Sequence, residues 1–203
     1  MGWLALACYA LYLVLAFGLR TAVQLRRTGS TGLNGISGRI GSLEWVAGVL
    51  FCVALAIGVL APVLDVTETI DPVAALDATW VHVLGGTLFA LGLCGTLYAQ
   101  LAMGDSWRIG VDERERTALV TEGPFALVRN PIFAAMIPTS VGLTLMVPNP
   151  VAFAGLAALV FALEIQVRLV EEPYLARAHG GAYAAYAAST GRFAPGIGRL
   201  HHR

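Results

Sequence analysis

"GPFALVRNPIF", residues 123–133, places an arginine and an asparagine directly before a long apolar run. The residue before a proline is pushed out of the α-helical region, whereas proline suits the first position of a helix. We therefore expect an extended approach to end at Asn130 and a helix to begin at Pro131. Because the residues that follow are apolar, this helix start marks one face of a membrane.

The rest of the chain has the composition of a membrane protein. Of its 203 residues, 57% are hydrophobic and only 13% are charged, which is more apolar material than a soluble domain of this length buries. A spanning helix needs roughly 20 apolar residues at 1.5 Å each. We expect an all-α integral membrane protein, a single membrane domain over residues 1–203, with five transmembrane helices at about residues 3–19, 43–64, 80–103, 131–147 and 151–167.

The arginines predict how these helices cross the membrane. The chain has no lysine, and its thirteen basic residues lie between the first two spans, between the third and fourth, and at or after the end of the fifth. The loop between the second and third spans instead carries four acidic residues. The positive-inside rule then puts the N-terminus outside and the C-terminus in the cytoplasm. High alanine and arginine content without lysine is typical of a GC-rich bacterial coding sequence, so we expect a bacterial inner membrane.

Short connections shape the C-terminal half. The "VPNP" turn, residues 147–150, is long enough only to join the fourth and fifth spans as a tight helical hairpin. Residues 168–203 form a cytoplasmic helical tail. The glycine-rich connector at residues 28–42 is assigned no chemistry.

Some functions are not indicated. The arginines are spread over separate segments without interleaved aromatic residues, so no nucleic-acid role is expected. The three cysteines lack metal-ligand spacing, so no metal site is expected. Nothing in the sequence indicates an obligatory protein partner.

The start of the fourth span is the first candidate site. The first N–H groups of a helix lack intrahelical partners and carry the positive end of the helix dipole, so Arg129 and Asn130 frame an anion site at the cytoplasmic face. The alternative is that Arg129 only reaches lipid phosphates and Asn130 only caps a helix.

The end of the fifth span is the second candidate. Glu164, Glu171 and Glu172 lie three or four residues from Arg168, so an ordinary α-helix places them on or beside its face. Charges at membrane depth are costly and normally functional, although an intrahelical ladder of ion pairs is the alternative. Tyr183 and Tyr186 belong to a pocket or to an interfacial aromatic anchor.

Both stretches resemble the isoprenylcysteine carboxyl methyltransferase and phospholipid methyltransferase superfamily of integral membrane enzymes. "TEGPFALVRNP", residues 121–131, is similar to the family's T-x-G-P-Y-x-x-x-R-H-P, and "EEPYLARAHGGAYAAY", residues 171–186, is similar to E-E-x-x-L-x-x-x-F-G-x-x-Y-x-x-Y. The chain departs from these patterns at Phe125, Asn130, Phe133 and His179. Asn130 replaces the usual histidine, which suits binding better than proton transfer.

The resemblance implies an enzyme that transfers a methyl group from S-adenosylmethionine to a lipophilic acceptor presented by the bilayer, with S-adenosylhomocysteine as product and the active site at the cytoplasmic interface. Arg168 and Glu172 are the catalytic candidates, Arg168 orienting the acceptor and Glu172 acting as a nearby orienter or base. The cofactor-binding candidates are Gln100, Gly123, Pro124, Arg129, Asn130, Pro131, Glu171, Glu172, Tyr183 and Tyr186.

Two other functions stay open. Membrane reductases of related fold use NADPH, although the tail offers only scattered arginines for its phosphates. A non-catalytic carrier or scaffold that kept the fold is the other, and Asn130 in place of histidine is the feature that favours it.

Overall fold

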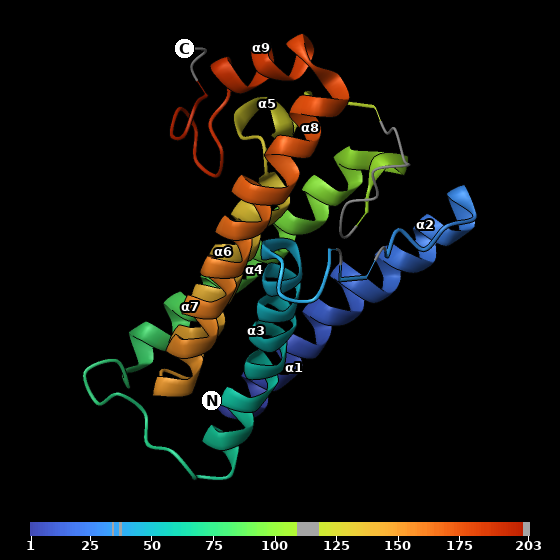
Figure 1. Ribbon diagram of the computed structural model, residues 1–203. Coiled ribbons are helices and arrows are strands. Elements are labelled where there is room, and N and C mark those ends of the chain that lie inside the picture. Colours follow the sequence, from blue (N-terminus) through green and yellow to red (C-terminus); the bar gives the residue numbers. More distant parts are fainter. Residues whose placement is uncertain (34, 37, 109–117, 201–203) are drawn as a thin grey trace.

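The structure is a computed structural model, and it describes residues 1–203 except 34, 37, 109–117 and 201–203 (Figure 1). Every named element in the described ranges is a helix, which confirms the predicted all-α membrane class. Four continuous helices are long and apolar enough to cross a membrane: Gly2–Thr28, Leu43–Val66, Thr79–Ser106 and Pro150–His179. The apolar helix Pro131–Met146 is shorter, so the count of five spans stays a prediction.

The first of these helices is longer than predicted. It consists of α1 (Gly2–Leu13), the π-helical segment η1 (Val14–Leu19) and α2 (Arg20–Thr28). The prediction ended this span near residue 19, where Arg20 follows. In the structure, Arg20 and Gln24 donate hydrogen bonds to the carbonyls of Gly104 and Asp105, so the polar turns of α2 continue the helix against the loop after α4.

The middle of the chain forms two antiparallel helix pairs. Helix α3 (Leu43–Val66) packs on α7 (Pro150–Ile165), and α4 (Thr79–Met103) packs on α6 (Pro131–Met146). The 3₁₀ turn η2 (Gly104–Ser106) extends α4, and the short helix α5 (Pro124–Leu127) precedes α6. As predicted, Pro131 begins its helix, with Asn130 in a non-helical conformation just before it.

The α4–α6 pair is in close backbone contact. A Cβ added to Gly85 would lie 2.7 Å from the carbonyl oxygen of Gly142, and one added to Gly92 would overlap Thr139. Helices in membranes gain no hydrophobic free energy from meeting each other, so small residues that allow close packing favour their association. The glycines therefore explain why these two helices pair.

The hairpin turn at residues 147–150 is tied to its neighbouring helix by one side chain. Asn149 is fully buried; its Oδ1 accepts the Ala152 N–H at 2.9 Å and caps α7, and its Nδ2 donates to the Ala61 carbonyl of α3 at 3.0 Å. The predicted hairpin at residues 147–150 is present, and this asparagine fixes it against α3.

The fifth helix also continues further than predicted. The π-helical segment η3 (Gln166–Glu171) and α8 (Glu172–His179) follow α7 without a break, and α9 (Gly181–Ser189) turns away from them. Residues 190–200, which we call the C-terminal strap, then run back beside the start of α6. The N–H groups of Arg129 and Asn130 donate to the carbonyls of Gly191 and Arg192, at 2.8 and 3.1 Å. At the top of Figure 1, α9 and the strap lie next to α5.

Candidate active site

A cavity of about 460 Å³ lies at this end of the bundle. It is enclosed by α1 and α3 on one side and by the α5–α6 junction, η3, α8 and α9 on the other. Seven of the residues singled out from the sequence line it: Gln100, Arg129, Asn130, Pro131, Glu171, Tyr183 and Tyr186. The fold thus brings together groups that lie up to 86 positions apart in the sequence.

One end of the cavity is polar. It is formed by the α5–α6 junction, Glu171 and the two tyrosines of α9. Glu171 is half-buried and accepts a 3.4 Å hydrogen bond from Gln166, one turn earlier on η3. The rings of Tyr183 and Tyr186 meet edge to face at 6.4 Å, and the Tyr186 hydroxyl donates to the Phe125 carbonyl at 2.6 Å. That hydrogen bond joins α9 to α5 and fixes the aromatic wall.

The opposite end is mostly apolar. Its walls come from α1 and α3, with Phe17, Phe51 and Leu55 among the lining side chains. The glycine-rich connector, to which the sequence assigned no chemistry, contributes Leu33, Gly35 and Ile36.

Gln100 connects the two ends. It is buried near the end of α4, and its Nε2 donates to the carbonyl of Ala16 in the π-helical segment η1 at 2.9 Å. Its Oε1 is buried and has no hydrogen-bond partner among the described residues. The Tyr183 hydroxyl is in the same situation. Because buried polar groups are normally satisfied, both atoms mark places where a ligand can bind.

Glu172 faces away from this cavity, toward the C-terminal strap. Its Oε1 accepts hydrogen bonds from Arg129 at 2.6 Å and from Arg192 at 2.8 Å, and its Oε2 accepts from Arg192 at 2.8 Å. Arg129 also donates to the carbonyls of Ala187, Thr190 and Gly198. We call Arg129, Glu172 and Arg192 the strap clamp. The expected catalytic and cofactor roles of Glu172 have no support in this geometry, because arginines occupy both of its oxygens.

The strap clamp also changes the interpretation of Arg129 and Asn130. The predicted anion site combined the free N–H groups of the first turn of the helix with Arg129 and Asn130 beside them. In the structure, the N–H groups of Arg129 and Asn130 donate to strap carbonyls, and the Asn130 side chain donates to the Arg192 carbonyl at 3.2 Å. The Arg129 guanidinium therefore holds the tail and is not directed at an anion in the cavity.

Arg168 lies outside the cavity, contrary to the role expected for it. Its side chain is 54% exposed and pairs with Glu164 on the outer face of the helix. The expectation assumed α-helical spacing across residues 164–172, but η3 has π-helical i→i+5 spacing. One additional residue in a turn rotates all later side chains by about 100°. Glu171 and Glu172 consequently leave the face of Arg168, so the four charges do not form one cluster.

Gly123 and Pro124 do not line the cavity, but they shape its edge. Gly123 has φ +60°, a conformation that favours glycine, and it precedes the Pro124 that begins α5. The short helix positions Phe125, which contacts Tyr186 through its carbonyl. The two residues act on the site through α5 and not by direct contact.

Sequence reasoning missed three groups around the cavity. Arg192 completes the strap clamp, Trp107 is buried in the wall, and Glu44 lines the cavity from the first turn of α3. Arg20 of α2 lies over the Trp107 ring at 4.7 Å and holds it in place. Arg108, the sequence neighbour of Trp107, lies over the Tyr174 ring at 5.4 Å. No local spacing could have indicated these partners, because each comes from a distant segment.

Comparison with known proteins places this geometry in a family. Residues 80–182, half of the chain, match the phospholipid methyltransferase family. The chain belongs to this family of membrane methyltransferases. The matched stretch runs from α4 through α8 and so contains Gln100, the α5–α6 junction and Glu171, whereas Tyr183 and Tyr186 follow it.

The individual relatives include one methyltransferase and two metal-resistance proteins. The chain is 30% identical over 110 residues to the protein-S-isoprenylcysteine O-methyltransferase B of Arabidopsis thaliana, covering 53% of this chain and 56% of that one. It is 33% identical over 121 residues to the cobalt-zinc-cadmium resistance protein CzcN of Cupriavidus metallidurans, covering 59% and 53%. It is 29% identical over 120 residues to the nickel-cobalt-cadmium resistance protein NccN of Alcaligenes xylosoxydans xylosoxydans, covering 59% and 54%. The alignments thus span about half the length of these relatives.

A solved structure has the same fold over nearly the whole chain. The eukaryotic intramembrane Ras methyltransferase ICMT (isoprenylcysteine carboxyl methyltransferase) superposes with a TM-score of 0.69 at 21% identity, covering 96% of this chain and 66% of that one. The isoprenylcysteine carboxyl methyltransferase-like fold predicted from the two motifs is confirmed.

Proposed function

We propose that this chain transfers the methyl group of S-adenosylmethionine to a lipophilic acceptor at the cytoplasmic face of a membrane and releases S-adenosylhomocysteine. One observation carries the proposal: a single cavity of about 460 Å³ has a polar end made by the family-matched segment together with Tyr183 and Tyr186, and an apolar end made largely by α1, η1 and α3. A zwitterionic cytosolic cofactor requires the first environment, and an acceptor drawn from lipid requires the second.

The polar end fits the cofactor's chemical groups. The unpaired oxygens of Gln100 and Tyr183, together with the Glu171 carboxylate, accept hydrogen bonds. The cofactor presents donors that match them, namely an ammonium group, an adenine amino group and ribose hydroxyls. The aromatic faces of Tyr183 and Tyr186 favour a neighbouring positive charge such as the sulfonium.

Catalysis in this site rests on positioning. The bound cofactor supplies an electrophilic methyl carbon, and the protein holds the acceptor's nucleophilic atom in line with it, away from water. Burial raises the pKa of Tyr183 and of Tyr186 to about 12, so both phenols stay neutral and orient ligands instead of removing protons. Asn130 does not titrate. We assign Gln100, Asn130, Glu171, Tyr183 and Tyr186 to cofactor contact, and Arg129 and Glu172 to fixing the strap that supports this contact.

The setting of the enzyme follows from the distribution of arginines. We place the cavity, the strap and the C-terminus in the cytoplasm and the N-terminus outside, in a bacterial inner membrane, because the arginine-bearing segments gather at the cavity end of the bundle. The charge-free "VPNP" turn lies at the opposite end.

Calorimetric titration of the detergent-purified protein with S-adenosylhomocysteine tests this proposal. We expect micromolar binding that Glu171→Gln weakens roughly 10-fold or more, because a hydrogen bond to a charged group contributes about 1.5–3 kcal/mol. Glu164→Gln, on the outer face of the same helix, should bind like the wild type.

Two outcomes would replace the proposal. Binding of NADPH without S-adenosylhomocysteine would indicate a membrane reductase of related fold. Binding of neither ligand by a folded protein would indicate a carrier or scaffold.

A further inference from the structure

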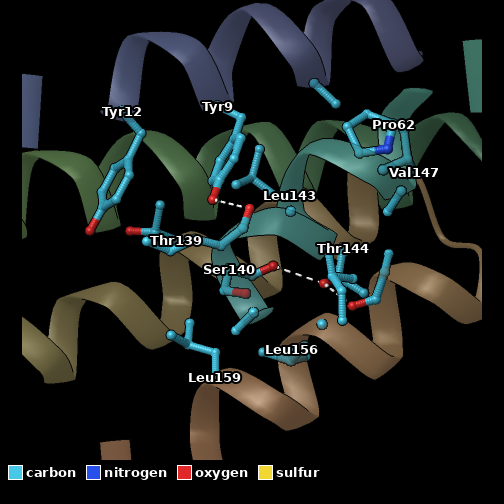
Figure 2. A pocket seen from close by; sticks show the side chains of 18 of the residues that line it. Tyr9, Tyr12, Pro62, Thr139, Ser140, Leu143, Thr144, Val147, Leu156 and Leu159 are labelled. Carbon is cyan, nitrogen blue, oxygen red and sulfur yellow. Dashed lines mark hydrogen bonds between the residues drawn. The ribbon is translucent and has the colours of Figure 1, made fainter. Parts of the chain in front are cut away.

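A second, smaller cavity of about 60 Å³ lies deeper in the bundle, between α1, α3, α6 and α7 (Figure 2). Three of its lining residues, Tyr12, Leu55 and Met136, also line the large cavity. These three side chains are therefore the partition between the two spaces.

The small cavity follows the bundle axis away from the cytoplasmic end. Along α1 its lining runs from Tyr12 to Ala5, about 10 Å at 1.5 Å per residue. Its other end reaches Val147, beside the outer hairpin turn. Small residues such as Ala54, Ala61 and Gly155 leave the space open. The small cavity thus continues the direction of the large one beyond the partition, and we call it the extension.

The polar atoms around the small cavity are almost all occupied by the protein itself. The Tyr9 hydroxyl donates to the Leu55 carbonyl at 2.8 Å, and the Thr144 hydroxyl donates to the Ser140 carbonyl at 2.9 Å (Figure 2). The Thr139 hydroxyl donates to the Ala135 carbonyl at 2.8 Å. The extension is consequently apolar in character, although hydroxyl-bearing residues surround it.

The Tyr12 hydroxyl is the exception. Tyr12 is only 3% exposed; no hydrogen bond of normal geometry is assigned to its oxygen within the described residues, and the Thr96 hydroxyl of α4 is a polar neighbour of it. Tyr12 stands in the partition, where a ligand that passes from one cavity to the other must meet it. An unsatisfied hydroxyl there suits a ligand that carries a hydrogen-bond acceptor next to an apolar chain.

We propose that the small cavity is the far end of the acceptor site and receives the terminal part of the acceptor's apolar chain. The inference rests on the proposed function, because it takes the apolar end of the large cavity to hold that acceptor. The acceptor lies with its head at the polar end, its chain crosses the partition at Tyr12, Leu55 and Met136, and its tip ends near Val147. Met136 is unbranched and flexible and can move aside for the chain.

The physical effect of this extension is selection by length. A chain drawn from the bilayer leaves surroundings as apolar as the cavity, so its transfer gains little free energy. The remaining contribution to binding is van der Waals packing. It increases with chain length until the cavity is filled, and a longer chain does not fit. The extension therefore sets a maximum chain length and adds little to affinity.

Photolabelling tests the occupancy directly. The probe is an N-acetyl-S-alkylcysteine whose chain ends in a diazirine, applied to the protein in phosphatidylcholine nanodiscs and mapped by mass spectrometry. We expect label on the α1 and α6 residues of the small cavity, abolished by excess unlabelled probe. Ala54→Leu, which fills the space, should reduce this labelling at least severalfold. Ala90→Leu, the same substitution on an exposed position of α4, should leave it unchanged.

The outcomes separate this inference from the proposed function. Label that is confined to outward-facing residues, or that resists competition, or that is equal in wild type and Ala54→Leu, would overturn the inference. Ser140→Leu provides a second filled variant in case Ala54→Leu does not fold. S-adenosylhomocysteine titration of each variant checks folding and the cofactor site independently. If wild type fails that titration while competable label remains in the small cavity, the methyltransferase proposal falls and the chain-binding site stands.

Discussion

The C-terminal strap and the α4–α6 pair join distant parts of the chain by opposite means. The strap is fixed by the buried charges of the strap clamp, whose three side chains satisfy one another and three backbone carbonyls of the tail and strap. The α4–α6 pair is fixed by Gly85, Gly92 and Gly142, where the lack of side chains lets backbones touch. The polar attachment lies at the cavity end of the bundle, and the apolar one lies within its apolar helices. Ion pairs and hydrogen bonds therefore hold the strap, whereas close backbone packing holds the two apolar helices together.

The strap clamp should show the largest effect of a single change. Glu172→Ala leaves Arg129 and Arg192 buried, at 2% and 10% side-chain exposure, without their carboxylate. Breaking a buried ion pair on one side costs about 3–5 kcal/mol. We expect a loss of that order in chemical unfolding followed by circular dichroism in detergent. Glu164→Ala removes the exposed partner of Arg168 and should change the free energy by less than about 1 kcal/mol. Equal effects of the two changes would mean that the strap is not held by this clamp.

The α4–α6 helix pair should show the second-largest effect. A Cβ at Gly142 would overlap backbone atoms of Gly85 and Phe89, which cannot rotate aside. We expect Gly142→Ala to destabilise the protein by about 1–3 kcal/mol in the same assay, as overpacking does. Gly86→Ala is the matched control on α4, because within the described chain a Cβ there meets nothing within 4 Å. A neutral Gly142→Ala would show that the close approach of the helices is not required.

The hairpin turn at residues 147–150 is fixed by a polar side chain that is buried among apolar helices. Its removal should destabilise the protein less than the two preceding changes. Asn149→Ala removes the cap of α7 and the donor to the buried Ala61 carbonyl. We expect a cost of about 1–2 kcal/mol, compared with about 0.5–1 kcal/mol for Ser42→Ala, whose hydroxyl caps α3 at a more exposed position. If Asn149→Ala cost no more than Ser42→Ala, the bond to α3 would contribute nothing.

The smallest effect appears only at high pH. Tyr183 has a pKa of about 12 in the fold, against 10.0 for an ordinary tyrosine, because of burial and the nearby Glu172 carboxylate. The unfolded chain therefore loses this proton first, and the tyrosine's contribution, complete below pH 10, is lost as the pH rises toward 12. We expect Tyr183→Phe to flatten the decline of stability across this window and to leave the neutral range unchanged. A parallel decline in both proteins would assign it to other groups.

The two regions also differ in how far the sequence predicted them. The apolar runs and the X-Pro junction at Asn130-Pro131 predicted the membrane helices and the start of α6, because both are local properties of the chain. The motif around residues 171–186 predicted the family and the cavity contacts of Glu171, Tyr183 and Tyr186. The length of the first helix was underestimated, because the partners that stabilise its polar turns follow α4.

The candidate site was predicted less well wherever the prediction depended on the direction in which a side chain points from its helix. Arg168, expected to orient the acceptor, does not line the cavity, because the π-helical segment η3 turns Glu171 and Glu172 out of its face, and the expectation assumed α-helical spacing throughout "EIQVRLVEEP". Arg192, which completes the strap clamp, looked like any arginine of a polar tail. Its significance depends on Glu172, twenty positions earlier and on another element.

By itself the sequence determined that this is a helical membrane protein, where its helices begin, and which family its motifs match, because hydrophobicity and proline act within a few residues. Only the tertiary structure decided which of two adjacent glutamates faces a ligand and which binds arginines. It also decided that the glycine-rich connector at residues 28–42 lines the large cavity, and that a second cavity lies on the other side of Tyr12. Those outcomes depend on the rotation of helices about their axes and on contacts between distant segments, which packing fixes and local spacing does not.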